Sequence, residues 1–286
     1  MADLISSLPN EIICHILSSL PSQQVVATSV ISKRWNLLWR DVPSLHFDNG
    51  NEYFGLLKCK KNTFYSSVSS FLAGHENQPF YRLRLRCYYS MYITKSIRTQ
   101  IQNAVTGSDR IQILDLYCNK NIVIPSVVFS FKTLVTLNLE RITVEDISFV
   151  DLPLLEILHL EDINSPVEID LSQFLFGCPN LKDLRVIRVR HLACETKGKF
   201  IRLPKLVRAC IHKFLLPLEI FKKVEVLELE WVKFHWIFQQ PNMDLNFDFH
   251  NLIRLELNVV RNWLLVLKLL NHCPKLQSLD ICIHKV

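Results

Sequence analysis

A short apolar motif recurs eight times in this 286-residue chain. Its unit is an apolar residue, two variable residues, a second apolar residue, one variable residue and a third apolar residue. The occurrences are Ile111-Leu114-Leu116, Leu134-Leu137-Leu139, Leu155-Leu158-Leu160, Leu181-Leu184-Val186, Leu206-Ala209-Ile211, Val224-Leu227-Leu229, Leu252-Leu255-Leu257 and Leu276-Leu279-Ile281. Successive central residues lie 23, 21, 26, 25, 18, 28 and 24 positions apart. One such motif arises by chance, whereas eight in order predict a chain of repeated structural units.

The spacing of the motif predicts one short strand in each repeat. Its intervals straddle the period of about 20–29 residues that is typical of leucine-rich repeats. Alternate strand side chains then point inward, and a return segment runs along the outer side. No repeat encloses its own leucines, so neighbours must bury them, at about 1.5–3 kcal/mol for each fully buried side chain. We therefore expect an α/β fold, a solenoid with a curved parallel sheet, over residues 111–286.

The first 49 residues show a helical pattern instead. Pro9 suits the first turn of a helix, since its missing N–H would be unpaired there in any case. Apolar residues follow at helical spacing until Pro21, and Ser22 and Ser32 can each cap another short helix. An all-α module of this size is small for an independent core, so its apolar surface needs a partner inside or outside the chain.

Between these parts, residues 50–110 are interpreted as a connector that caps the solenoid. Two helices are expected on either side of a strand at Tyr81–Cys87. The first carries Phe64, Val68, Phe71 and Leu72, and the second carries Ile93, Ile97 and Ile101. The sequence thus divides into a helical module (1–49), a connector (50–110) and a solenoid (111–286).

Composition narrows the class of protein. Hydrophobic residues make up 49% of the chain and charged residues 21%, which suits a packed core. No apolar run approaches the roughly 18 residues of a membrane span. Asp3 and Glu11 interrupt the N-terminus, which lacks the basic region of a signal peptide. Nine scattered cysteines are interpreted as reduced, buried residues. We expect a soluble protein of the cytoplasm and/or nucleus.

The charge pattern and the missing motifs argue against several activities. Net charge alternates, with −1 for residues 1–50, +6 for 51–110, −7 for 111–176, +7 for 177–233 and +1 for 234–286. A single phosphate-binding face is therefore not expected, and nucleic acid is not the expected partner. Gly50 and Gly55 have P-loop spacing, but Leu56 and Leu57 stand where phosphate binding needs Lys and Ser/Thr. We expect no enzyme activity, no metal and no cofactor.

The sequences of the helical module and of the repeats both resemble those of a known family. The stretches Leu8-Pro9-Asn10-Glu11-Ile12-Ile13, Ile16-Leu17-Ser18-Ser19-Leu20-Pro21, Thr28-Ser29-Val30-Ile31-Ser32-Lys33-Arg34-Trp35 and Leu38-Trp39 resemble an F-box. Cys178-Pro179-Asn180-Leu181 and Cys273-Pro274-Lys275-Leu276 are similar to phrases in the repeats of plant F-box/leucine-rich-repeat proteins. Ile31 departs from the pattern, because leucine is commoner there. The resemblance covers nearly the whole chain.

This resemblance implies a non-catalytic substrate-recognition subunit of a Skp–cullin–F-box (SCF) ubiquitin ligase. The F-box would dock on a Skp-type adaptor, and through it a cullin, while the repeats hold a target protein. Adaptor-binding candidates, carried over from the resemblance, are Leu8, Pro9, Ile12, Ile16, Leu20, Pro21, Val30, Ile31, Lys33 and Trp35. Several of these could instead form the module's own core, which is the role we expect for Leu17, Val26, Leu38 and Trp39. The alternatives are a binding scaffold tethered to a Skp-type protein without driving degradation, and a small-molecule sensor.

The repeat register also selects candidates for target binding. The residue between the last two apolar positions should project from the concave surface. These residues are Asp115, Asn138, His159, Arg185, Cys210, Glu228, Glu256 and Asp280, flanked by Tyr117, Glu140, Glu161, Arg208, His212 and Glu230. We take Asp115, Asn138, His159, Arg185, Arg208, Glu228 and Glu256 as the substrate-binding set, because complementary charge sets specificity and association rate. A merely solvated strand face is the alternative.

The resemblance raises one question about the end of the chain. Many members of the family carry a further domain after the repeats, whereas this sequence stops at Val286, just after a Cys-Pro-x-Leu repeat. We expect the last strand, 276–284, to form an exposed sheet edge.

Overall fold

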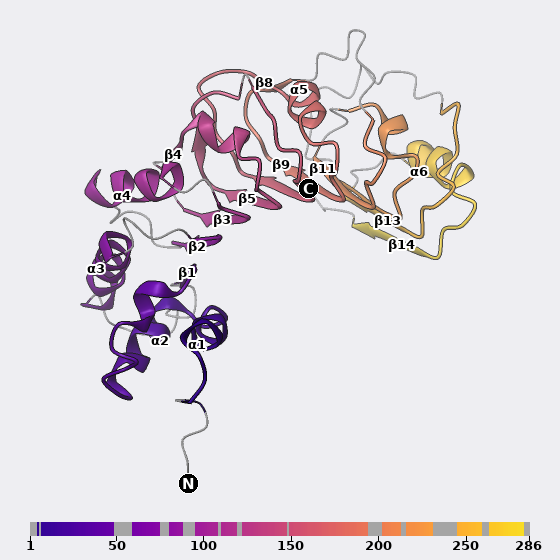
Figure 1. Cartoon of the computed structure of the whole chain (residues 1–286). Helices are drawn as coiled ribbons and strands as arrows, with labels where there is room; N and C mark the ends of the chain where they lie inside the picture. The colour runs from indigo at the N-terminus through magenta and orange to yellow at the C-terminus, as the bar shows by residue number, and fades with distance from the viewer. Residues whose placement is uncertain are drawn as a thin grey trace.

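The computed structural model describes residues 5, 7–48, 59–74, 80–87, 95–107, 110–118, 122–147, 149–193, 202–212, 216–230, 245–258 and 263–282. Within these residues, ten parallel strands form one curved sheet, with a helical cluster at its N-terminal end (Figure 1). The strand order is β1-β2-β3-β5-β7-β9-β11-β12-β13-β14. The expected architecture, a helical module followed by a parallel-sheet solenoid, is confirmed.

Short helices and turns make up the N-terminal module. They are α1 (Asn10–Leu17), α2 (Ser22–Ala27), η1 (Thr28–Val30) and η2 (Leu38–Asp41). Pro9 and Pro21 each occupy the position just before a helix, where a residue without an N–H costs no hydrogen bond. The third helix that was expected after Ser32 is a series of turns that ends in η2.

Strand register in the sheet follows the sequence motif. The strands are β1 (Ser44–Asp48), β2 (Arg82–Arg86), β3 (Ile113–Tyr117), β5 (Thr136–Glu140), β7 (Ile157–Glu161), β9 (Asp183–Ile187), β11 (Arg208–His212), β12 (Val226–Glu230), β13 (Arg254–Asn258) and β14 (Ser278–Cys282). Leu137 pairs with Leu158 and Leu158 with Leu184, and all three are 0% exposed. The predicted strand positions are therefore confirmed, and like positions of successive repeats stack in one buried row.

The outer side of the sheet is built from helices and short strand pairs. It contains α3 (Cys59–Gly74), α4 (Lys95–Thr106), η5 (Ser126–Ser130), α5 (Leu171–Phe176), η6 (Leu218–Phe221) and α6 (Trp263–Asn271), with β4 (Val123–Ile124) beside β6 (Thr143–Val144) and β8 (Ile169–Asp170) beside β10 (Leu192–Ala193). The Asp170 carboxylate caps α5 by accepting from the Ser172 N–H at 2.9 Å. Among the described residues, no helix is long and apolar enough to cross a bilayer.

The sheet begins earlier than the sequence indicated. β1 and β2 pair with each other in register, and β2 pairs with β3, so the sheet runs without a break through residues 44–48 and 82–86. Leu83 and Leu85 alternate with arginines and are 1% exposed, and the corresponding residues from β3 to β13 are likewise buried. The predicted boundaries after residues 49 and 110 therefore have no counterpart in the sheet, and the presumed connector supplies one of its strands.

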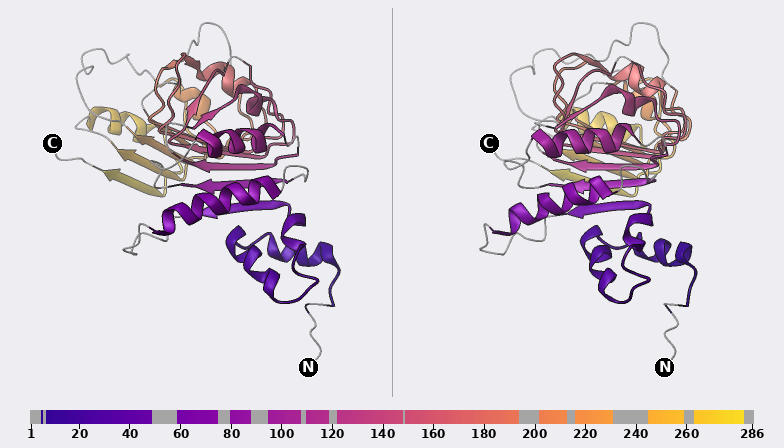
Figure 2. Two further views of the ribbon diagram at one scale, coloured as in Figure 1. Left: turned by 90° about the vertical axis from the view of Figure 1, so that its left-hand side faces the viewer. Right: turned by 60° about the vertical axis from the view of Figure 1, so that its left-hand side comes forward.

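One tryptophan joins the helical module to the solenoid. Trp39 packs against the core of the module and also against that of the solenoid, 5.0 Å from the Phe71 ring. A Cβ at Gly74 would lie only 2.8 Å from the Trp39 ring, so this close approach requires glycine. Ser22 Oγ accepts the backbone N–H of His46 in β1 at 2.8 Å. The module thus sits directly on the first strand of the sheet (Figure 2).

The stacked leucines should dominate stability. Replacing Leu158 by alanine removes a fully buried side chain and should cost about 2–5 kcal/mol of unfolding free energy. Leu154 is four residues away and 52% exposed, so Leu154→Ala should change it by less than about 0.5 kcal/mol. Urea unfolding followed by circular dichroism measures both variants, and equal losses would contradict this packing.

Candidate functional site

An apolar surface covers part of the N-terminal module. Ile12 and Ile16 lie one turn apart on α1 and are 47% and 48% exposed. Val30 and Ile31, at the end of η1, are 87% and 57% exposed. Single exposed apolar residues are ordinary, whereas several of this size in so small a module indicate a contact surface.

One arginine brings the two parts of this surface toward each other. Arg34 Nε donates to Asn10 Oδ1 at 3.0 Å, and Arg34 also donates to the backbone oxygen of Leu8. Residues 30–34 are thereby held near the start of α1. We call the exposed residues Ile12, Ile16, Val30 and Ile31 the apolar face of the module.

The structure places most, but not all, adaptor-binding candidates at the surface. Pro9, Ile12, Ile16, Val30, Ile31 and Lys33 are exposed, and Leu8, Leu20 and Pro21 are half-buried. The assignment of Trp35 to the adaptor-binding surface is corrected, because this side chain is 6% exposed and lies in the module's core beside Leu38. So small a core needs its largest ring inside. Contact of the other candidates with an adaptor stays a prediction.

The expected core residues are mostly confirmed. Leu17 and Leu38 are buried, and Trp39 is half-buried against both cores. Val26 was wrongly assigned, since it is 37% exposed, while its neighbour Val25 is 1% exposed and takes the inward position on α2. The sequence analysis also missed the exposed Leu37, which no periodic pattern singles out.

A second surface is the inner face of the sheet. The predicted alignment of one residue from each strand in a row is confirmed, because the register pairs each member with the next. In strand order the row is Asp115, Asn138, His159, Arg185, Cys210, Glu228, Glu256 and Asp280. It extends beyond the prediction at the N-terminal end, where Arg84 of β2 and His46 of β1 are in register with Asp115.

Exposure varies along this row. Cys210 is 7% exposed and Asp115 is 8% exposed, so neither projects freely as expected. Arg208 is exposed, and Asn138, His159, Arg185, Glu228 and Glu256 are half-buried. Short side chains between longer neighbours are covered by them, which explains Asp115 and Cys210.

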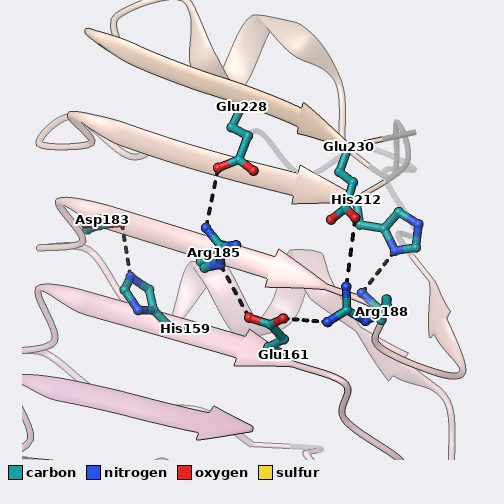
Figure 3. A network of polar contacts seen from close by, with 8 residues as sticks. All are labelled: His159, Glu161, Asp183, Arg185, Arg188, His212, Glu228 and Glu230. Carbon is teal, nitrogen blue, oxygen red and sulfur yellow. Dashed lines mark hydrogen bonds and ion pairs between the residues drawn. The ribbon is translucent and has the colours of Figure 1, made fainter. Parts of the chain in front are cut away.

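Ion pairs link the middle of the inner face across four strands (Figure 3). Arg185 lies between two carboxylates, 3.5 Å from Glu161 Oε2 and 3.4 Å from Glu228 Oε2. Arg188 reaches the same Glu161 at 2.5 Å and Glu230 at 3.8 Å. The inner face therefore presents a pre-arranged array of charges rather than separate side chains.

Similarity to known proteins was found for both parts of the chain. The model of the F-box domain matches residues 5–47, which span α1 to most of β1. F-box/FBD/LRR-repeat protein At5g22700 of Arabidopsis thaliana is 34% identical over 196 residues, 68% of this chain and 43% of that protein. F-box/FBD/LRR-repeat protein At3g52680 of the same plant is 34% identical over 216 residues, 73% of this chain and 45% of that protein.

The chain belongs to the plant family of F-box proteins with leucine-rich repeats. A further relative, F-box/LRR-repeat protein At4g14096 of Arabidopsis thaliana, is 33% identical over 187 residues, 64% of this chain and 39% of that protein. The chain spans less than half the length of the curated relatives it matches. The helical module is thus the F-box, and the curved sheet is the repeat domain.

Most of the described cysteines of the repeat domain are buried thiols, whereas Cys282 in β14 is exposed. Burial raises the pKa of Cys178 to about 12 and that of Cys273 to about 11. Both groups stay protonated at neutral pH, and a thiol is a poor nucleophile and metal ligand. Among the residues that the structure describes, no group of three or more His, Cys, Asp or Glu could hold a metal ion.

A hollow of about 560 Å³ opens at the rim of the repeat domain, where β7, β9 and β11 end. Its lining residues are Asp162, Val186, Arg188, Val189, Arg190, His191, Leu192 and His212. Asp162, Arg188 and His191 have φ angles of 54°, 50° and 53°, which are uncommon for residues other than glycine. The Arg188 N–H donates to His212 Nδ1 at 3.0 Å, which fixes the backbone there.

Two carboxylates lie next to each other on the inner face. Glu140 and Glu161 are in register on β5 and β7. Burial, followed by the charge of Glu161, raises the pKa of Glu140. A raised pKa in the folded state means that the ionised carboxylate lowers the free energy of unfolding. This destabilisation is present at pH 7 and disappears as the pH falls through that pKa.

Removing one charge of the Glu140–Glu161 pair should change the free energy of unfolding in a pH-dependent way. Glu140→Gln should raise the unfolding free energy at pH 7 by at most about 1 kcal/mol, the size of a like-charged contact between facing strand residues, and should match the wild type once both carboxyls are protonated. Glu225 is exposed, and Glu225→Gln is the control that should change nothing. Urea unfolding across pH tests this, and a variant less stable than the wild type at pH 7 would contradict it.

Proposed function

We propose that this chain is a substrate-recognition subunit of an SCF-type ubiquitin ligase. The F-box docks a Skp-type adaptor, and through it a cullin, while the inner face of the repeat domain binds a target protein. Such a receptor catalyses no bond change itself, but holds its target close to a ubiquitin-conjugating enzyme. The observation that carries the proposal is the apolar face of the F-box, on a module matched by the F-box family.

The apolar face has the character of a docking surface. Ile12 and Ile16 project from one side of α1, while Ile13 and Leu17, about 100° further round the helix, fill the module's core. In an amphipathic helix, the side that faces away from the core is usually polar. On α1 this side carries two isoleucines. Covering them with an adaptor would contribute about 1.5–3 kcal/mol for each fully buried side chain.

The inner face has the character of a recognition surface. Its ion pairs are partly exposed, and exposed pairs contribute little to stability, typically about 0–1 kcal/mol. Charge arrays of this kind instead select partners by complementarity and speed their association. The parallel strands hold the array in one register, so a target meets charges in fixed positions.

The rigid joint between the two surfaces supports a receptor role. Trp39 and Phe71 pack the F-box against the repeat domain, and Tyr81 Oη at the start of β2 lies 3.4 Å from Ser18 Oγ at the end of α1. A target bound to the inner face would therefore keep a defined position relative to the adaptor. Such a protein would work in the cytoplasm or nucleus, where these ligases act.

One observation favours a second candidate function. The rim hollow has the size of a small-molecule site, which typically measures about 300–1,000 Å³. A small-molecule sensor, or a scaffold that binds a partner without driving its degradation, remains the alternative. Copurification of a cullin and growth of ubiquitin chains on the bound partner separate the ligase from the scaffold.

The adaptor surface gives a direct test. Ile12→Asp with Ile16→Asp places two charges where apolar contact is needed, so capture of a Skp-type adaptor should fall at least about a hundredfold. The control carries Leu154→Asp with Val167→Asp, which are exposed to a similar degree in the repeat domain, and should capture adaptor normally. Adaptor binding by the α1 variant that equals the control would contradict the proposal.

A further inference from the structure

A set of three arginines lies on the inner face at the end nearest the F-box. Strand β2 reads Arg-Leu-Arg-Leu-Arg, and its two leucines are buried in the core, so Arg82, Arg84 and Arg86 share the opposite, inner side. The side chains of Arg84 and Arg86 are 38% and 28% exposed. We call these three residues the arginine row.

The Asp115 carboxylate contacts two members of the row. Asp115 of β3 is in register with Arg84. Its Oδ2 lies 3.0 Å from Arg84 Nε, and Arg86 Nη2 donates to Oδ1 at 3.2 Å and to Oδ2 at 3.1 Å. Asp115 itself is 8% exposed. One buried acceptor group is therefore shared between two guanidinium groups, each of which has five N–H donors.

Donors of the row remain for a ligand. Arg82 has no ion pair among the described residues, and its guanidinium lies 5.9 Å from the centre of the Tyr81 ring. The Nε of Arg82 is buried without a hydrogen-bond acceptor in the part of the chain that the structure describes. Because the protein covers this Nε, a ligand would instead accept from the terminal Nη groups of Arg82, which carry the other four N–H donors.

The positive charge at this end of the inner face comes from the arginines and not from the neighbouring histidine. His46 of β1 is in register with Arg84 on the side opposite Asp115. Burial, and then the charge of Arg84, lower the pKa of His46, while Asp48 and Asp115 act in the other direction with less effect. The imidazole is thus held neutral at pH 7, and it leaves the charge of this region to the arginines.

We propose that the arginine row binds an acidic segment of a partner protein. In the unbound protein, the Asp115 carboxylate occupies part of the position that a carboxylate of this segment would take. Guanidinium groups bind carboxylates in paired, charge-assisted hydrogen bonds. Alternate residues of β2 are about 6.8 Å apart, the same as alternate side chains of an extended peptide. The segment is an acidic part of the target under the proposed function, which this inference extends.

The rest of the inner face selects a short acidic segment over nucleic acid. Beyond β3 its carboxylates include Glu140, Glu161, Glu228, Glu230, Glu256 and Asp280. A long polyanion laid along the sheet would meet these groups and be repelled. Among the strands that the structure describes, β2 alone carries three arginines on one face, so a peptide with a local acidic stretch fits where a nucleic acid does not.

The test uses the full chain and a short fluorescein-labelled peptide of alternating glutamate and serine. Fluorescence anisotropy at low ionic strength should show that Arg82→Gln, Arg84→Gln and Arg86→Gln together weaken binding about tenfold or more. The matched control replaces the exposed Lys205, Lys222 and Lys223 by glutamine, which removes the same charge elsewhere and should change binding less than about twofold. Equal weakening in both triple variants overturns the proposal.

A second variant tests the role of Asp115 independently of any loss of fold. Asp115→Asn keeps the size of the side chain but removes the negative charge that Arg84 and Arg86 both contact, so it should strengthen peptide binding about threefold or more. A purely structural Asp115 would give unchanged or weaker binding, and that result overturns the proposal.

Adaptor capture by the same proteins keeps the two hypotheses apart. The arginine row lies outside the apolar face, so all three variants should bind a Skp-type adaptor as the wild type does. If the variants do not change peptide affinity as expected while adaptor capture is normal, only the proposal about the arginine row is refuted. Absent adaptor capture by the wild type refutes the proposed function and leaves the peptide result to stand by itself.

Discussion

The structure depends on the burial of one repeat's leucines by the next. In each five-residue strand two apolar side chains turn inward, and neither can leave water until a neighbouring strand lies beside it in the same register. Leu137, Leu158 and Leu184 show the result, with no exposed surface on three successive strands. Because all strand pairs are parallel and unshifted, the outward side chains also align, and the fixed charges of the inner face are a by-product of packing the core.

The same constraint attaches the F-box to the repeats. β1 is matched by the F-box family, yet it is the first strand of the sheet and pairs with β2 along its whole length. Trp39 then fills the space between the two cores, with Gly74 cleared of a side chain to admit it. The two surfaces assigned here to an adaptor and a target are therefore parts of one body, linked by buried contacts.

The sequence was sufficient where a local period carries the information. Alternation of apolar residues predicted the register from β3 to β14, and thereby the projecting row from Asp115 to Asp280. It placed β2 in a connector and missed β1, although Val42-Leu45-Phe47 and Phe80-Leu83-Leu85 both fit the motif. The helices of residues 50–110 stretch the spacing of Leu45, Leu83 and Leu114 to 38 and 31 residues, which lies outside the repeat period. Trp35 and Val26 were exchanged between core and surface, since helical spacing in very short helices does not fix which side faces inward. The sharing of Asp115 between Arg84 and Arg86 depends on residues of different strands, which no local pattern joins.

The central claim is that the adaptor and the target use different surfaces of one body. Hydrogen–deuterium exchange of the chain, with and without a Skp-type adaptor, tests it most directly. The account predicts slower exchange of backbone amides in residues 10–17 and 28–34 when adaptor is bound, and unchanged exchange in the strands from β5 to β14. Protection of those strands by the adaptor, with none in the F-box, would contradict it.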